Sequence, residues 1–217
     1  MNLETILHRK ISFKDLESVQ SSLVERSRKD SAQGFVLISE PSPTFSCGVS
    51  GKPNEVLFSD SQRAEFGIDS FKVRRGGKWT YHGPGQILLY PILNLKNLGL
   101  GTKNSETFMT LITEATLNFL KTIKIPAIVR REPYGIYVGD AKLVSFGLGI
   151  SRGITMHGTA LYVEDQRAFF NGIIPCGVAT ALISLRELGV SESWETLAKQ
   201  WAFEVEKAFN LTKKLLT

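Results

Sequence analysis

The order of helix-like and strand-like segments limits the possible folds of this chain more than any other feature. The spacing of apolar residues predicts four helices, over residues 13–29, 105–121, 177–188 and 193–209. Short apolar runs predict strands over residues 35–38, 87–92, 136–138, 142–147 and 161–163. These segments do not alternate regularly, as they would in a doubly wound sheet. The sequence therefore predicts an α+β fold on a mixed or antiparallel β-sheet.

Glycine and proline refine this prediction at three places. Pro91, within the run 87–92, indicates an edge strand or a bulge, because proline cannot donate to a strand ladder. Residues 139–141 separate two strand-like runs at a spacing typical of a hairpin. Residues 75–86 contain four glycines, a proline and a histidine. That composition predicts neither a helix nor a regular strand for this segment.

Length and composition are those of an ordinary globular domain. The chain has 217 residues, 42% hydrophobic and 22% charged, which predicts a single domain over residues 1–217. No run approaches the roughly 20 apolar residues of a membrane span, so we expect no membrane association. The start of the chain lacks the basic and apolar segments of a secretory signal, and Glu4 and Asp15 argue against a transit peptide. We therefore expect a cytoplasmic protein.

Charge and cysteine content exclude some kinds of partner and site. The net charge of +5 favours the capture of acidic partners by electrostatic steering, and it equally suits a surface charged for solubility. Basic residues occur in short pairs without an aromatic recognition motif, so we expect no nucleic-acid binding. The chain has two cysteines, Cys47 and Cys176, and three histidines. We expect free thiols in a reducing cytoplasm and no metal site of the Cys₄ or Cys₂His₂ kind.

Two glycine-flanked segments carry polar residues suited to a binding site. Residues 75–86 present Arg75 and His82 on a backbone that glycine allows a ligand to approach closely. Residues 153–160 contain His157, and their small residues could form the wall of a pocket for a slender chain. Residues 75–86 equally suit an irregular turn whose histidine satisfies a buried polar neighbour, and a lone histidine such as His157 is more often structural than catalytic.

Cys176 is the candidate nucleophile. It lies between a proline and a glycine at the start of the predicted helix 177–188, where a packing role has little to offer. Backbone N–H groups and the positive end of a helix dipole would stabilise a thiolate there. A buried, inert cysteine is the commoner fate of a lone cysteine.

The proton acceptor for such a thiol stays open at this point. Lys142 begins an apolar run, and a desolvated lysine has a lowered pKa and can act as both base and acid. His82 and His157 are the alternatives. The sequence contains no dinucleotide fingerprint, phosphate loop, His-Glu-x-x-His motif or Gly-x-Ser-x-Gly nucleophile elbow.

Taken together and in this order, these segments resemble the lipoyl(octanoyl) transferase family over roughly residues 35–188. The matching residues are Arg75-Gly76-Gly77, Thr80-Tyr81-His82-Gly83-Pro84-Gly85-Gln86, Tyr90-Pro91, Gly135-Ile136-Tyr137-Val138, Ala141-Lys142, Phe146-Gly147, His157-Gly158, Ala160-Leu161 and Pro175-Cys176-Gly177, with Thr44-Phe45-Ser46-Cys47-Gly48 and Gly51-Lys52 upstream.

The resemblance implies an α+β catalytic domain like that of lipoate and biotin protein ligases, without a cofactor. It implies transfer of octanoyl from octanoyl acyl carrier protein to a lysine of lipoyl domains, those of 2-oxoacid dehydrogenases and of the glycine cleavage H protein. By position, Cys176 would carry the acyl group as a thioester and Lys142 would activate it. The acyl pocket would be lined by Arg75, Gly76, Gly77, Lys78, Trp79, Thr80, Tyr81, His82, Ser145, Phe146, Gly147, Gly158, Thr159 and Ala160.

Three residues depart from the family pattern. Pro41 stands where a histidine is usual, Tyr162 where asparagine is common, and Trp79 where a smaller aliphatic residue is usual. These departures concern acyl-chain length and carrier docking more than the reaction type. The alternatives are an ATP-dependent lipoate-protein ligase, which would not need Cys176, an acyl-binding protein without turnover, and a thiol hydrolase.

Overall fold

The centre of the protein is a seven-stranded mixed sheet. A computed structural model describes residues 2–99, 104–174 and 181–216, with side chains up to residue 210. Across the sheet the strands are β1 (Asn2–Ile11), β2 (Gln33–Pro41), β6 (Gln86–Ile92), β10 (Ile154–Tyr162), β9 (Ala141–Ser151), β8 (Tyr134–Val138) and β7 (Ile128–Arg131). Within this sheet only β1 and β2 pair in parallel, and the other neighbouring strands are antiparallel. The expected α+β class is confirmed, and one domain over all of residues 1–217 stays a prediction.

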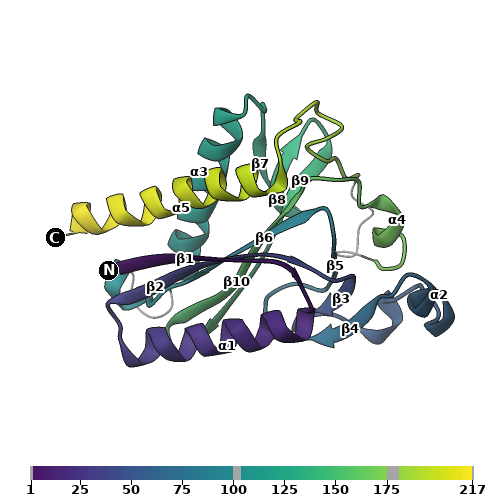
Figure 1. Cartoon of the computed structure of the whole chain (residues 1–217), viewed down its shortest axis with the longest axis horizontal. Coiled ribbons are helices and arrows are strands. Elements are labelled where there is room, and N and C mark those ends of the chain that lie inside the picture. The colour runs from purple at the N-terminus through teal and green to yellow at the C-terminus, as the bar shows by residue number, and fades with distance from the viewer. Residues whose placement is uncertain (1, 100–103, 175–180, 217) are drawn as a thin grey trace.

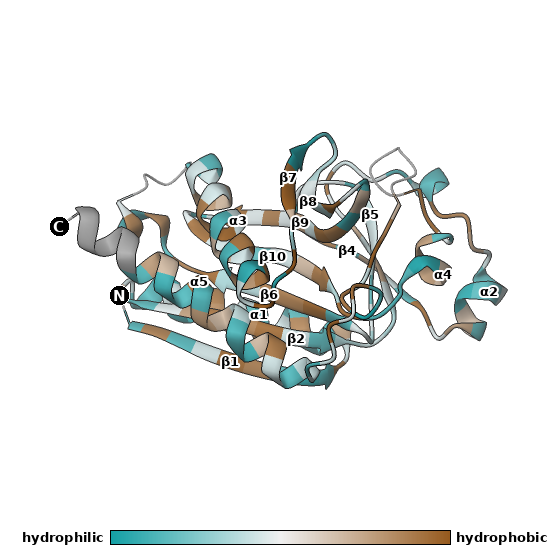
Figure 2. Cartoon of the chain, turned by 90° about the horizontal axis from the view of Figure 1, so that it is seen from above, coloured by the Kyte–Doolittle hydropathy of each residue, from teal (hydrophilic) through white to brown (hydrophobic). Residues whose placement is uncertain are grey.

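Three long helices cover the two faces of this sheet (Figure 1). They are α1 (Phe13–Lys29) on one face, and α3 (Ser105–Thr122) and α5 (Trp194–Leu216) on the other. Figure 2 shows apolar and polar residues interspersed along each helix, as amphipathic packing requires. The strands alternate between the two faces: Leu88 and Tyr90 pack toward α1, whereas Ile87 and Leu89 pack toward α3 and α5. The predicted helices 13–29, 105–121 and 193–209 are confirmed.

A smaller three-stranded sheet, β4 (Asp69–Lys72), β3 (Thr44–Cys47) and β5 (Trp79–His82), lies beside the large one. The prediction that residues 75–86 contain no regular strand is wrong for β5, which pairs antiparallel with β3. The glycines lie in the turns on either side of β5, so they leave four residues free to pair. Short elements complete the fold: η1 (Pro53–Glu55), α2 (Asp60–Glu65), η2 (Leu95–Leu98) and α4 (Arg167–Phe170).

The prediction for Pro91 is wrong in placing it on an edge strand, because β6 lies between β2 and β10. The β6–β10 ladder includes Leu89 and Thr159 and is bridged again only at Asn94. In the gap, the Thr155 hydroxyl donates to the Pro91 carbonyl at 2.6 Å and accepts from the Leu93 N–H at 2.9 Å. The Thr155 side chain thus satisfies the Pro91 carbonyl and the Leu93 N–H where the ladder is interrupted.

The prediction of a helix over 177–188 is wrong for residues 181–188; residues 177–180 lie outside the described part. The Lys142 N–H donates to the Ala181 carbonyl at 2.7 Å, and the Ile183 N–H donates to the Lys142 carbonyl at 3.1 Å. The Leu185 N–H donates to the Tyr162 carbonyl at 2.9 Å. Because the β9–β10 ladder ends at Val144 and Leu161, the backbone of this segment satisfies groups at the open ends of both strands instead of forming a helix.

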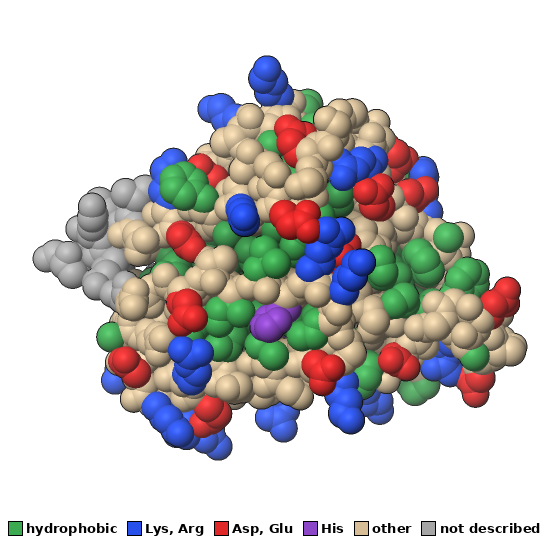
Figure 3. Space-filling model, viewed as in Figure 1, with side chains coloured by type: hydrophobic (Ala, Val, Ile, Leu, Met, Phe, Trp, Pro, Cys, Tyr) green, Lys and Arg blue, Asp and Glu red, His purple; other side chains and the backbone are tan. Residues whose placement is uncertain are grey.

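Figure 3 shows basic and acidic side chains mixed over the visible face of the molecule. In the described part of the chain, none of the helices combines the length and the hydropathy that crossing a membrane requires.

Candidate active site

A cavity lies between strands β8, β9 and β10 of the large sheet and the segment Arg75–His82. Its volume, measured for the centre of a water-sized sphere, is about 80 Å³, which is room for several water molecules. The residues that border it are Arg75, Gly77, Lys78, Trp79, Thr80, His82, Tyr90, Tyr134, Lys142, Ser145, Phe146, Gly147, His157, Gly158, Thr159, Ala160, Tyr162, Phe170 and Leu182.

The cavity brings together nearly all residues of the predicted acyl pocket. Of these, only Gly76 and Tyr81 do not border it. The Gly76 N–H donates to the Leu148 carbonyl at 2.9 Å and so holds the turn against β9. Tyr81 stacks on Phe169 with ring centroids 4.5 Å apart, within the core of the small sheet. Its neighbours Thr80 and His82 border the cavity, as expected when alternate residues of a strand face opposite sides.

The sequence-based list of pocket residues missed several aromatic and apolar members. The sequence did single out two of them: Tyr90 matches the family pattern and Tyr162 departs from it. Either observation could have placed these tyrosines in the pocket. Tyr134, Phe170 and Leu182 gave no such signal, because each reaches the cavity through the fold of a different segment.

Lys142 lies at the wall of the cavity and is 5% exposed. Its Nζ donates to the Tyr134 carbonyl at 3.2 Å and lies 5.3 Å from the centroid of the Tyr137 ring. Gly135 makes room for this side chain, because a Cβ there would lie 2.8 Å from Lys142 Cε. The lysine is therefore held with its amine beside β8 and largely out of solvent.

Cys176, with Pro175 and Gly177, lies outside the described residues. The chain on both sides is anchored: the Ile174 N–H donates to the Glu55 carbonyl at 2.8 Å, and Ala181 accepts from the Lys142 backbone. Cys47, the other cysteine, is a free and buried thiol in β3. Cys47 does not border the cavity.

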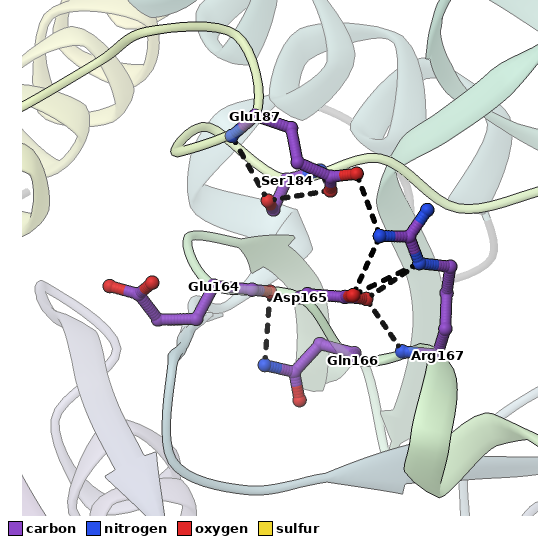
Figure 4. Close-up of polar contacts among 6 residues, drawn as sticks. All are labelled: Glu164, Asp165, Gln166, Arg167, Ser184 and Glu187. Carbon is purple, nitrogen blue, oxygen red and sulfur yellow. Dashed lines mark hydrogen bonds and ion pairs between the residues drawn. The ribbon is translucent and has the colours of Figure 1, made fainter.

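Ser184, Glu187, Arg167 and Asp165 form a polar clamp. The clamp lies next to Ala181 and Ile183, the residues whose backbone bonds to Lys142. Figure 4 shows Glu187 accepting from the Ser184 hydroxyl at 2.8 Å, while Arg167 bridges Glu187 and Asp165. The Arg167 guanidinium lies 2.9 Å from Glu187 and 2.6 Å from Asp165. The clamp links the end of β10 and α4 to the segment hydrogen-bonded to Lys142.

Arg75 is a buried positive charge at the other side of the cavity. Its guanidinium donates to the Ser46 carbonyl and hydroxyl at 2.7 and 2.8 Å, and to the Gly76 carbonyl at 2.9 Å. Gly147 is needed opposite, because a Cβ there would lie 2.9 Å from Arg75 Cδ. The Arg75 charge also helps to lower the pKa of His82 and of His157, the two histidines that border the cavity.

Both histidines are neutral at pH 7. Burial, with a further contribution from Arg75, lowers the pKa of His82 and of His157 to about 3 in each case. The Gln86 amide nitrogen donates to the Tyr81 carbonyl. The Gln86 oxygen therefore faces His82 Nδ1 at 3.2 Å, and that nitrogen carries the proton. With such low pKa values, neither histidine is an effective base near neutral pH, which favours Lys142.

Helix α1 contributes a polar group behind His157. Glu17 Oε1 lies 3.7 Å from His157 Nδ1. Burial raises the pKa of Glu17 to about 7, although the Arg75 charge acts in the opposite direction. Gln20 joins the two residues: its side-chain amide nitrogen donates to Glu17 at 3.2 Å, and its side-chain oxygen accepts from the main-chain N–H of His157 at 2.6 Å.

Two residues that depart from the family pattern have defined contacts here. The Tyr162 and Ser145 hydroxyls lie 2.6 Å apart, and the Tyr162 ring packs edge-on against Phe170 at 5.6 Å. The Trp79 indole donates to the Lys52 carbonyl at 2.8 Å. Trp79 and Tyr162 both border the cavity. Within the described residues, no group of three or more His, Cys, Asp or Glu is arranged to hold a metal ion.

The family model and the similar proteins both point to the same family. Residues 14–205 match the lipoyl protein ligase A/B catalytic domain. The octanoyltransferase of Shewanella piezotolerans is 34% identical over 202 residues, 91% of this chain and 88% of that protein. The octanoyltransferase of Caldanaerobacter subterraneus is 30% identical over 203 residues, 93% of this chain and 87% of that protein. The acyltransferase class predicted from the sequence agrees with these names.

Solved structures share the fold. A lipoate-protein ligase A bound with ATP superimposes with a TM-score of 0.80 at 13% identity, over 97% of this chain and 86% of that chain. A biotin protein ligase from Aquifex aeolicus in complex with biotin and ATP gives 0.56 at 14% identity, over 99% and 72%. The resemblance found in the sequence is thus confirmed, and the chain belongs to the lipoyl protein ligase A/B catalytic domain family, among relatives named octanoyltransferase.

Proposed function

We propose that this protein transfers an octanoyl group from octanoyl acyl carrier protein to a lysine of lipoyl domains, through a thioester on Cys176. The observation that carries the proposal is the buried amine of Lys142 at the wall of a cavity whose sides include glycine and alanine. The relatives named octanoyltransferase, which match over about nine-tenths of the chain, support the same chemistry.

The proposed reaction has two half-reactions. In the first, Lys142 accepts the Cys176 thiol proton, the thiolate attacks the carrier thioester, and the carrier thiol leaves with the proton that Lys142 returns. In the second, the acceptor lysine amine attacks the acyl-enzyme, the C–S bond breaks, and Lys142 passes the amine proton to the departing Cys176 sulfur. No ATP is consumed, because the donor is already a thioester.

Residues 181–188, which were expected to continue a helix that begins after Cys176, are not helical. Ala181 and Ile183 instead hold the Lys142 backbone through two hydrogen bonds. The first described residues after the Cys176 segment, Ala181 to Ile183, are thus hydrogen-bonded to the backbone of Lys142. This contact supports a joint role for Lys142 and Cys176.

We propose the partners from the same chemistry. The donor is an acyl carrier protein, whose acidic surface suits the net charge of +5. The acceptors are lipoyl domains of 2-oxoacid dehydrogenases and the glycine cleavage H protein, and the site of action is the cytoplasm. The reaction needs no added cofactor.

An acyl-enzyme measurement tests this proposal. Incubation with octanoyl acyl carrier protein is expected to raise the intact mass of the protein by one octanoyl group. Cys176→Ser is expected to abolish the increase, whereas Cys47→Ser, the matched control in β3, should retain it. A wild-type protein that stays unmodified, or a label carried by Cys47, would contradict the proposal. Modification of a lipoyl domain by free octanoate and ATP alone would identify a ligase instead.

A further inference from the structure

A pair of hydroxyl groups lies at the wall of the cavity. The side-chain oxygens of Ser145 and Tyr162 are 2.6 Å apart, and both residues border the cavity. Ser145 pairs across the sheet with Ala160, and Tyr162 follows two residues later on β10, so both side chains project from the same face. Packing of the Tyr162 ring against Phe170, with ring centroids 5.6 Å apart, holds the phenol in place. Two neighbouring strands thus build this pair.

A β-bulge brings the Lys142 side chain to the same face as the hydroxyl pair. Residues three apart on a regular strand face opposite sides of a sheet. In β9, however, Val144 and Lys142 pair with consecutive residues of β8, so Leu143 is an extra residue. Leu143 and Val144 both pack into the core beneath α3 and α5, whereas Lys142 and Ser145 both border the cavity. The bulge therefore places an amine and a hydroxyl pair along one wall.

The hydroxyl of Ser145 keeps its proton for a ligand. Within the described part of the chain, its one hydrogen bond is the contact with Tyr162. A phenol is more acidic than an alcohol and is therefore the better donor, so the Tyr162 O–H donates and Ser145 Oγ accepts. Accepting one hydrogen bond strengthens the bond that the Ser145 O–H donates in turn. Because Ser145 is only half-buried and borders the cavity, that proton is available there.

Two other hydroxyls at the cavity use their protons on the protein. The Thr159 hydroxyl donates to a main-chain carbonyl of β6 at 3.2 Å. The Tyr134 hydroxyl lies 2.7 Å from that of Thr113, which gives its own proton to a carbonyl of α3, so Tyr134 donates to Thr113. Ser145 differs from both, and it projects from the same strand as Lys142. Acyl transfer develops negative charge on a carbonyl oxygen, and a donor fixed on the same wall as the base can stabilise that charge.

We propose that Ser145 is a catalytic residue whose hydroxyl donates a hydrogen bond to the carbonyl oxygen of the acyl thioester, and that Tyr162 is the positioning residue that orients this hydroxyl. The inference rests on the proposed function, because it takes the reaction to be acyl transfer through Cys176. Tyr162 stands where asparagine is common in the family pattern, so the hydroxyl pair belongs to this chain in particular.

The proposed role is the same in both half-reactions. Attack on the carbonyl carbon moves the π electrons of the C=O bond to its oxygen. Collapse of the tetrahedral intermediate returns those electrons as the bond to the leaving group breaks. Ser145 stabilises the charged oxygen between these two events and keeps its own proton, so Lys142 alone handles the protons of the sulfur and the amine.

Single-turnover loading tests the role of Ser145. Octanoyl acyl carrier protein is mixed with each variant over a range of concentrations, and acyl-enzyme formation is followed by rapid-quench mass spectrometry. Ser145→Ala is expected to lower the maximal rate at least tenfold and to leave the half-saturating concentration within about twofold of wild type, because the hydrogen bond strengthens as the charge develops. Ser151→Ala, also half-buried in β9 but not bordering the cavity, is the matched control and should keep the wild-type rate. A smaller loss of maximal rate, or a loss confined to the half-saturating concentration, overturns the inference.

A double-mutant cycle tests whether Tyr162 acts through Ser145. Tyr162→Phe keeps the aromatic ring and removes only the hydroxyl. We expect this change to slow loading at least threefold in the wild-type protein, and to have a smaller effect in Ser145→Ala, where no hydroxyl is left to orient. A smaller loss in the wild-type protein, or a loss of the same size in both backgrounds, overturns the positioning role of Tyr162.

The infrared spectrum of the acyl-enzyme gives a readout that does not depend on rates. A hydrogen bond from Ser145 lowers the stretching frequency of an isotope-labelled thioester carbonyl, so Ser145→Ala is expected to raise it, and an unchanged frequency overturns the inference. Octanoyl loading separates the two proposals. A wild-type protein that forms no acyl-enzyme refutes the proposed function and this inference with it, whereas normal loading by both the wild-type protein and Ser145→Ala refutes only this inference.

Discussion

Replacing Glu17 with glutamine tests the electrostatics behind the cavity. The Glu17 side chain is 27% exposed, and burial raises its pKa to about 7. In the unfolded chain the pKa of a glutamate is about 4.3. The folded pKa is therefore above the unfolded one, so the stability that the protonated carboxyl contributes is present at low pH and is lost as the pH rises toward 7.

The size of the effect follows from the shift. A difference of about 2.7 pKa units corresponds to roughly 3.7 kcal/mol when the group is fully ionised. Partial exposure and the nearby Arg75 charge reduce that, so we expect about 2 kcal/mol. Glutamine keeps an oxygen for the bond from Gln20, which measures 3.2 Å, and carries no charge. Glu17→Gln should therefore gain about 2 kcal/mol relative to wild type between pH 5 and pH 8.

Urea denaturation at pH 5 and at pH 8 measures this difference in the free energy of unfolding. The control is Glu25→Gln, on the same helix but exposed, where the hydrogen bond from Arg28 lowers the pKa of Glu25. The control should show no gain at pH 8 over wild type. If the Glu17→Gln advantage is the same at both pH values, then Glu17 ionises as it would in water, and the description of its surroundings is wrong.

Three further substitutions probe the site. Lys142→Arg should fold normally and load octanoyl slowly, because arginine cannot give up its proton; wild-type rates in a rapid-quench mass assay would remove the lysine from the mechanism. Gly158→Ala would place a Cβ against the Leu89 carbonyl and 3.0 Å from Pro91 Cδ, so chemical denaturation should show a loss of about 1–3 kcal/mol, and unchanged stability would refute that close approach. Glu187→Ala removes the partner of Ser184 in the clamp, so amide hydrogen exchange should speed up around residues 181–185; protection equal to wild type would show that the clamp does not hold this segment.

Patterns among residues close together in the sequence predicted the helices and the hairpin whose boundaries such residues determine. The helices α1 and α3 have apolar faces of regular period and begin at capping residues, Ser12 and Asn104, so their bounds could be placed from sequence. The hairpin at Gly139 followed from its spacing. β1 was missed because its residues are mostly exposed or half-buried and polar, so no alternation marks it. The segment 181–188 was misassigned because its apolar spacing suits a helix equally well, and only contacts with Lys142 and Tyr162 show otherwise.

Much of the site could be predicted because a family pattern, rather than periodicity, connected distant segments. That pattern led to Arg75, Lys142 and Gly158, which the fold brings to one cavity. It gave no indication of Glu17, which lies on the first helix and reaches His157 only when α1 packs on the sheet. A contact between residues so far apart in the chain depends on tertiary packing, and spacing along a single sequence does not encode it.

The most direct test of the account measures the acceptor rather than the enzyme. A lipoyl domain is incubated with octanoyl acyl carrier protein and the wild-type protein in the absence of ATP, and the mass of the lipoyl domain is recorded. The proposed mechanism predicts one octanoyl group on the acceptor lysine of the lipoyl domain, and none when the enzyme carries Cys176→Ser. A lipoyl domain that stays unmodified, or that is modified equally well by the serine variant, would contradict it.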